Sequence, residues 1–254
     1  MIKNIFLEIS YDGSNYFGWQ IQNNSTVKSE ILGTKTVQGK VENALRKLFG
    51  ENIRVIYAGR TDRGVHAKAQ CVNFKIDTRI PIKNIKNALN AFLPDDIRIK
   101  KVRLVPLSFH ARFSARSKIY RYIIFNRKEP SVFLNRYAWH IPQKIDIERM
   151  KKASLYLKGE KDFSCFAKEA SKYKSCIRKM LNINIKRKGS YVYIDMEATG
   201  FLRNMARNIV MFLVRVSESK ISLKQAKDIL NKKIPYTNKP APAYGLYLWK
   251  VKYE

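Results

Sequence analysis

Hydrophobic residues recur with two different periods along the first half of the chain. Apolar side chains stand at every second position from Ile5 to Tyr11, which is the period of a β-strand with one buried face. Between residues 41 and 49 they fall at spacings of three and four, which predicts an amphipathic helix. The same patterns predict strands at 53–58, 72–76 and 97–105, and a helix at 82–92 that ends before Pro94. The predicted order of this half is βαββαβ.

The second half repeats this order with one additional helix. Alternation at 120–124 predicts a strand, and apolar spacing after Asp146 predicts a helix at 147–157. Two strands, at 181–185 and 191–196, are separated by a turn at 188–190. The remaining elements are an apolar helix at 202–213, a shorter helix opened by Ser222 and a last strand at 246–251.

These patterns predict an α+β protein made of two βαββαβ halves of the ferredoxin-like or RRM-like type. The sheets are expected to be mostly antiparallel with helices on one face, and a catalytic cleft is expected between the halves. We place the first half at 1–106 and the second at 107–254. Residues 21–35 are polar and turn-rich and are expected to form an exposed loop.

Charge narrows the class of partner. The 254 residues contain 50 Lys and Arg against 20 Asp and Glu, a formal net charge of +30, so we expect a polyanionic partner. The basic residues are spread over the whole chain among Tyr and Phe, which favours nucleic acid over an acidic membrane surface or an acidic protein. No apolar run approaches the roughly 18 residues of a membrane span, so we expect a soluble, cytoplasmic protein.

Cysteine and histidine positions argue against a metal site. Three cysteines without a C-x-x-C pair favour free thiols over disulfides or structural zinc; they are Cys71, Cys165 and Cys176. The three histidines are far apart and lack the spacing of metal ligands. We therefore expect no bound metal.

One segment combines tight turns with charged side chains. Gly59-Arg60-Thr61-Asp62-Arg63-Gly64-Val65-His66 connects two predicted strands and places a carboxylate between two arginines. Nearby positive charge favours an ionised carboxylate, which suits Asp62 to act as a nucleophile or base. The residue types alone favour the other interpretation, a turn with a capping aspartate.

The same segment resembles the G-R-T-D-x-G-V-H-A signature of the tRNA pseudouridine synthase A family. Other parts of the chain are similar to the family's remaining motifs, in the family's order. They are Tyr11-Asp12-Gly13 with Trp19 and Gln20, Thr36-Val37-Gln38, Phe109-His110-Ala111-Arg112-Phe113-Ser114-Ala115, Lys118 to Tyr122, Arg203 to Ile209, and Ala241-Pro242 with Gly245 to Leu248.

The resemblance implies an isomerase that converts uridine to pseudouridine in the tRNA anticodon stem-loop, at positions 38, 39 and/or 40. It implies no cofactor, tRNA as partner and a homodimer. Asp62 takes the place of the family's catalytic aspartate, and the resemblance implies substrate-binding roles for four further residues. Arg60 is expected to contact RNA and help splay out the target base, Tyr120 to stack on it, Arg207 to pair with Asp62, and Leu246 to cover the base.

Other interpretations stay open. An aromatic residue such as Tyr120 on a strand is more often part of a core, and Arg207 on an apolar helix needs an acidic partner. A non-catalytic RNA-binding module, or a basic structural protein of a ribonucleoprotein particle, would also be basic. The long connection at 21–35, Arg63 and Met211 depart from the family's pattern and allow a divergent synthase that acts on another RNA site.

Overall fold

The computed structural model describes residues 1–21, 35–237 and 239–253, and it divides into two compact units. The first unit comprises Met1–Arg116 together with the chain from Leu248 onward, and the second comprises Ser117–Tyr247. The loop expected at 21–35 falls almost entirely outside the described residues, and a division into domains at residue 106 stays a prediction.

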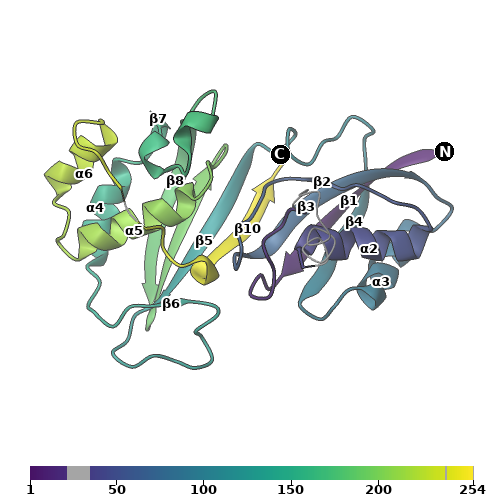
Figure 1. The fold of residues 1–254 in the computed structure, drawn as a ribbon, viewed down its shortest axis with the longest axis horizontal. Coiled ribbons are helices and arrows are strands. Elements are labelled where there is room, and N and C mark those ends of the chain that lie inside the picture. Colours follow the sequence, from purple (N-terminus) through teal and green to yellow (C-terminus); the bar gives the residue numbers. More distant parts are fainter. Residues whose placement is uncertain (22–34, 238, 254) are drawn as a thin grey trace, which may run out of the picture. The chain divides into compact units, whose positions relative to one another are not determined.

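The sheet of the first unit is built around its N-terminal strand (Figure 1). Strand β1 (Ile2–Tyr11) pairs antiparallel with β3 (His66–Asp77) on one side and with β4 (Ile97–Val105) on the other. The short strand β2 (Ile56–Tyr57) also pairs with β3, and β10 (Leu246–Lys252) lies beside β3. The strand order in this unit is therefore β4-β1-β3-β10.

Helices α2 (Val37–Phe49) and α3 (Ile82–Phe92) pack on one face of this sheet. The alternating residues Ile5, Leu7 and Ile9 are fully buried. Phe74, the register partner of Ile5, contacts Phe49 of α2 with ring centroids 6.0 Å apart, so the helices cover this face. The hydroxyl of Thr36 accepts the N–H of Gly39 and begins α2, and Gly50 ends it in a left-handed conformation (φ 79°).

The opposite face of β1 and β3 is covered by the segment that follows β4. The buried side chain of Asn73 donates to that of Asn4 (2.9 Å), which in turn donates to the carbonyl of Pro106 (2.8 Å). The N–H of Ala111 donates to Asn73 Oδ1 (2.8 Å), and the Phe6 and Phe109 rings meet edge to face. Residues 106–111 are thus held on the sheet by buried amide side chains.

The second unit also contains an antiparallel ladder. Its strand order is β5-β9-β8-β7, and β6 pairs in parallel with β5. The bounds of these strands are β5 Ser117–Phe125, β6 Trp139–His140, β7 Gly159–Asp162, β8 Ile177–Lys188 and β9 Tyr191–Ala198.

Three helices pack together in this unit. Helix α4 (Ile147–Leu155) contacts α5 (Met205–Ser217), α6 (Leu223–Leu230) and β8. Helix α5 is buried over most of its length, so it forms the centre of the unit's core. The cap of α6 is a capping box of Ser222 and Gln225, and Asp146 caps α4 as predicted. Short 3₁₀ turns stand at Ser164–Phe166, Ala170–Lys172 and Ala243–Gly245.

The predicted α+β class with mostly antiparallel strands is confirmed. The strand predicted at 53–58 is wrong in extent, because the ladder includes Ile56 and Tyr57 alone among these residues. Val55 is buried, but its N–H donates to the Glu42 carboxylate of α2 (3.1 Å) instead of a neighbouring strand. None of the helices in the described part of the chain has the length and apolar character that a bilayer crossing requires.

Candidate active site

Asp62 lies in the connection between β2 and β3, as the sequence predicts. Its carbonyl accepts the N–H of Val65 (3.1 Å) and closes a tight turn, in which Gly64 adopts a φ of 77°. A positive φ of this size suits glycine and strains most other residues. Asp62 is half-buried, whereas Arg63 in the same turn is exposed.

A buried hydrogen-bond network fixes the chain immediately before Asp62. The hydroxyls of Tyr11 and Thr61 are hydrogen-bonded at 2.7 Å, and both residues are buried. Gln70 on β3 donates to the carbonyl of Gly59 (2.7 Å) and also bonds to the Tyr11 hydroxyl. Burial raises the pKa of Tyr11 well above its usual range, so the phenol keeps its proton at neutral pH.

Two glycines let the chain after β1 approach the Asp62 turn at main-chain distance. A Cβ on Gly13 would lie 2.0 Å from the carbonyl oxygen of Val65, and one on Gly18, at φ 95°, would lie 2.6 Å from that of Thr61. The N–H of Trp19 donates to the Thr61 carbonyl (3.1 Å), and that of Gly13 donates to Nδ1 of buried His66 (3.1 Å). The turn is therefore held on both sides by backbone atoms.

Two arginines of the segment reach the surface close to Asp62 in sequence. Arg60 is exposed, and its Nε donates to the hydroxyl of Tyr57 (3.2 Å). The guanidinium of Arg63 lies over the Phe17 ring, 4.6 Å from its centroid. The half-buried carboxylate thus belongs to a rigid turn whose neighbouring side chains are positive, an arrangement suited to an anionic substrate.

The other predicted site residues belong to the second unit. Tyr120 on β5 is 6% exposed, and its ring meets that of Phe201 edge to face, with centroids 4.8 Å apart. Arg207 near the start of α5 is half-buried, and its Nε donates to the carbonyl of Ala241 (2.7 Å). Leu246 is buried and begins β10 directly after the 3₁₀ turn.

The segment 241–246 links the helix of Arg207 to the strand of Tyr120. Beside the bond of Arg207 to Ala241, the hydroxyl of Tyr122 donates to the carbonyl of Pro242 (2.8 Å). A Cβ on Gly245 would lie 2.6 Å from the Tyr122 ring, so the segment packs directly on β5. One short stretch of chain in the second unit therefore contains Leu246 and contacts both Arg207 and the strand that carries Tyr120. The pairing of Asp62 with Arg207 concerns residues of different units and stays a prediction.

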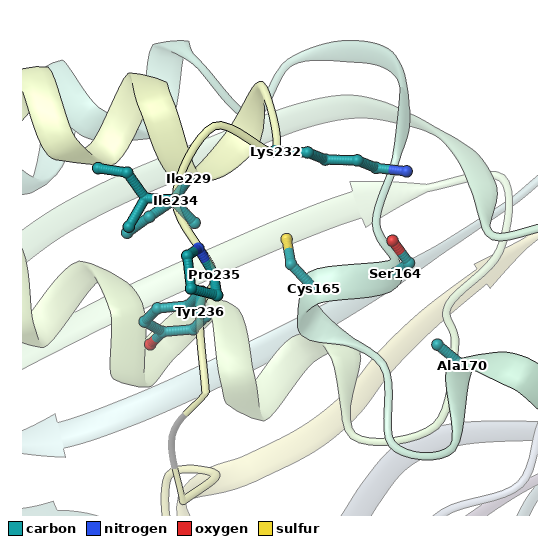
Figure 2. Close-up of a pocket in the computed structure, with 8 residues that line it drawn as sticks. All are labelled: Ser164, Cys165, Ala170, Ile229, Lys232, Ile234, Pro235 and Tyr236. Atoms are coloured by element: carbon teal, nitrogen blue, oxygen red, sulfur yellow. The ribbon is translucent and has the colours of Figure 1, made fainter.

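The second unit also has an open cavity of about 330 Å³ away from these residues (Figure 2). Burial raises the pKa of the Cys165 thiol in its wall to about 11, so this sulfur is protonated and weakly nucleophilic at neutral pH. Lys232 of the same wall pairs with Asp162. The other lining residues are Ser164, Ala170, Ile229, Ile234, Pro235 and Tyr236, and no predicted site residue is among them.

The anchoring role of Tyr11, Thr61 and Gln70 was not predicted from the sequence. One signal was available: Gln70 and Asn73 are uncharged polar residues next to the apolar run Cys71-Val72 and Phe74, and a polar side chain that is buried there requires a hydrogen-bond partner. Within the described residues, no group of three or more His, Cys, Asp or Glu side chains is arranged to hold a metal ion.

Comparison with known proteins shows similarity to one family along most of the chain. The family described as tRNA pseudouridine synthase matches residues 9–114 and 153–254, which include Arg60, Asp62, Arg207 and Leu246 but not Tyr120. A tRNA pseudouridine synthase A of Thermoanaerobacter sp. (strain X514) is 42% identical over 99% of this chain and 100% of its own length. Proteins of the same name from Caldicellulosiruptor bescii and Prochlorococcus marinus (strain MIT 9312) are 41% and 43% identical, over 99% and 100% of this chain and 100% and 92% of their own.

Replacing Tyr11 by Phe tests the buried anchor. The ring keeps its place near Trp19 (centroids 5.9 Å apart), but Thr61 and Gln70 lose a buried partner. We expect the free energy of unfolding to fall by about 1–3 kcal/mol. Amide hydrogen exchange should also become faster in 59–66 than in the parent protein.

The matched control is Tyr253→Phe, which removes another tyrosine hydroxyl in the same unit, one that donates to the carbonyl of Ala111 (2.9 Å). This variant should leave hydrogen exchange in 59–66 at the parent rate. Equal exchange in 59–66 for both variants would show that Tyr11 does not anchor the turn specifically.

Proposed function

The chain belongs to the tRNA pseudouridine synthase family, a family of isomerases, and on this basis we propose that it converts uridine to pseudouridine in the tRNA anticodon stem-loop. The target is position 38, 39 and/or 40, and Asp62 is the catalytic carboxylate. The observation that supports this role is the turn itself. Main-chain contacts and buried hydrogen bonds hold the turn that carries this half-buried residue, and two arginines stand beside it in the sequence.

The reaction needs no external reactant, because substrate and product are isomers. The bond from N1 of uracil to C1′ of the ribose breaks, the base turns, and a bond forms from C5 to C1′. The proton at C5 is lost and N1 gains one. A positioned carboxylate can attack the ribose, attack the base or remove a ribose proton, and each of these routes uses the ionised form of Asp62.

The remaining site residues are proposed to handle the base and the charge. A uridine within a stem must leave the stack before its glycosidic bond can be reached, and the exposed Arg60 is suited to contact the displaced strand. Tyr120 provides an aromatic face for the flipped base and Leu246 an apolar cover. Arg207 pairs with Asp62 and favours its ionised form.

The partner, the compartment and the oligomeric state are proposed from the net charge and the family. A net charge of +30 matches the phosphates of tRNA as partner. We propose a cytoplasmic homodimer, in which one tRNA lies across both subunits. Light scattering with and without tRNA tests this assembly, and a monomeric mass for the complex would contradict it.

Asp62→Asn is the decisive variant, because it is nearly isosteric but cannot act as nucleophile or base. Tritium release from 5-tritiated uridine in tRNA should fall by more than the roughly 10²- to 10⁴-fold that one acid or base group contributes. The tRNA Kd should stay close to the parent value, since phosphate contacts elsewhere carry most of the affinity.

Asp95→Asn is the control for Asp62→Asn. Its side chain lies in the same unit and is fully exposed, and the change removes the same charge, so activity should be kept. An Asp62→Asn protein that folds, binds tRNA and isomerises at the parent rate would overturn the mechanism. Mapping the product by carbodiimide-blocked primer extension distinguishes positions 38–40 from another RNA site, and a complete lack of pseudouridine would favour a non-catalytic binding module.

Tyr120 is tested by comparing Phe with Leu. Tyr120→Phe keeps an aromatic face for the base and for Phe201, whereas Tyr120→Leu removes it. We expect single-turnover isomerisation to fall much further in the Leu variant, with tRNA affinity little changed. If both variants mainly lower Tm and leave the rate per folded molecule intact, Tyr120 is a core residue.

Arg207 requires variants that separate its charge from its bond to Ala241. Arg207→Gln can still donate to the Ala241 carbonyl but has no charge, and Arg207→Lys keeps the charge. If the charge supports Asp62, kcat should fall much more in the Gln variant than in the Lys variant, at similar tRNA Kd. Equal kcat in both variants would assign Arg207 to the packing of 241–246.

A further inference from the structure

A second surface of the first unit has the features of an RNA contact, and no residue of it is used in the proposed chemistry. The residues that cross the sheet after β4 end in a turn at 111–113, which we call the His110–Phe113 turn because His110 begins it. Arg112 and Phe113 in this turn are exposed, and Phe113 is 76% exposed. A single apolar side chain on a surface is ordinary, so the exposure of Phe113 alone carries no conclusion.

The turn is rigid, which distinguishes Phe113 from a mobile surface residue. Nδ1 of His110 accepts the N–H groups of Arg112 and Phe113, both at 3.2 Å. His110 and Ser114 exchange two further bonds: Ser114 N–H donates to the His110 carbonyl (2.9 Å), and His110 N–H donates to Ser114 Oγ (3.1 Å).

The turn is also fastened to the sheet beneath it. Ala111 is fully buried, its N–H donates to Asn73 Oδ1, and its carbonyl accepts the hydroxyl of Tyr253. The backbone that carries Phe113 is therefore fixed before any ligand arrives. A ligand that contacts the ring does not have to order this part of the chain.

The chemistry of the turn suits a nucleotide. The imidazole of His110 lies against the Phe113 ring, with centroids 4.3 Å apart and planes 32° apart, so it supports the ring from one side. The guanidinium of Arg112 lies over the same ring at the longer distance of 5.5 Å from its centroid, and the Phe113 side chain stays 76% exposed. An aromatic face beside a cation binds a base by stacking and its phosphate by charge, and the chain's large positive charge attracts such a partner.

We propose that the His110–Phe113 turn is a stacking platform for an unpaired base of the RNA substrate, with Phe113 under the base and Arg112 at its phosphate. The residues of the platform, 110–113, are distinct from those of the Asp62 turn, 62–65. The proposal rests on the proposed function for the identity of the ligand as RNA.

The test measures the Kd for unmodified tRNA by fluorescence anisotropy in the Asp62→Asn protein, so that no turnover interferes. Phe113→Ala should weaken binding by roughly 5- to 150-fold, the range for the loss of one stacked base, and Phe113→Tyr should stay close to the parent. The slope of log Kd against log salt should not change for Phe113→Ala. Arg112→Gln should reduce that slope by about 0.7 to 0.9, the value for one phosphate contact.

Phe133→Ala is the matched control, because Phe133 is 85% exposed but belongs to the second unit. It should leave the Kd unchanged. Parent-like binding by Phe113→Ala, or equal weakening by Phe133→Ala, overturns the proposal. If Phe113→Ala lowers Tm, the Phe113→Leu variant is measured in its place. A Kd of the Phe113→Leu protein close to that of the parent also overturns the proposal.

Two further outcomes separate the hypotheses. If Phe113→Ala weakens binding while light scattering shows that it also lowers the molecular mass of the free protein, the ring contacts a second copy of the chain and the platform is wrong. If the parent protein binds tRNA through Phe113 but forms no pseudouridine, the proposed function fails and the platform stands. Normal isomerisation together with parent-like binding by Phe113→Ala rejects the platform alone.

Discussion

The hydrogen bond between the buried hydroxyls of Tyr11 and Thr61 is the constraint on which the candidate site depends. It joins the end of the central strand to the residue before Asp62, and Gln70 of the neighbouring strand completes the network. A hydroxyl buried here without a partner would be costly, so the strand and the turn have to adopt their positions together. The position of the Asp62 backbone is in this way a property of the sheet that supports it.

Acidic residues are few in this chain, and several of them form hydrogen bonds and ion pairs that stabilise the units. Glu42 accepts hydrogen bonds from Gln38, Arg54 and the N–H of Val55, and Asp195 holds Arg121 in a two-bond ion pair. Lys232 lowers the pKa of Asp162, its partner, so this carboxylate stays ionised and bonded well below neutral pH. Because acidic groups are engaged within the units, the surplus of Lys and Arg remains available to bind phosphates.

Local patterns predicted most elements because strand and helix periods are properties of the sequence itself. The capping residues Asp146 and Ser222 marked the starts of two helices correctly. The short strands β6 and β7 were missed, since Gly159–Asp162 contains no apolar alternation. The strand predicted at 53–55 is wrong because the Glu42 side chain of α2, and not a neighbouring strand, accepts the N–H of Val55. No local pattern encodes this contact. For the same reason, motifs pointed to Asp62 but not to Gln70, whose role depends on contacts with residues distant in sequence.

The main-chain fastening of the Asp62 turn has a consequence for how this protein can change over evolutionary time. Gly13 and Gly18 approach backbone atoms, and Tyr11 holds Thr61, so neither contact involves the side chain at position 63. That side chain is exposed beside Phe17. Its charge and size can therefore drift without displacing the carboxylate next to it. Position 63, an arginine in this chain, is therefore a place where mutation can change the electrostatic potential near Asp62 while the backbone of the turn stays the same.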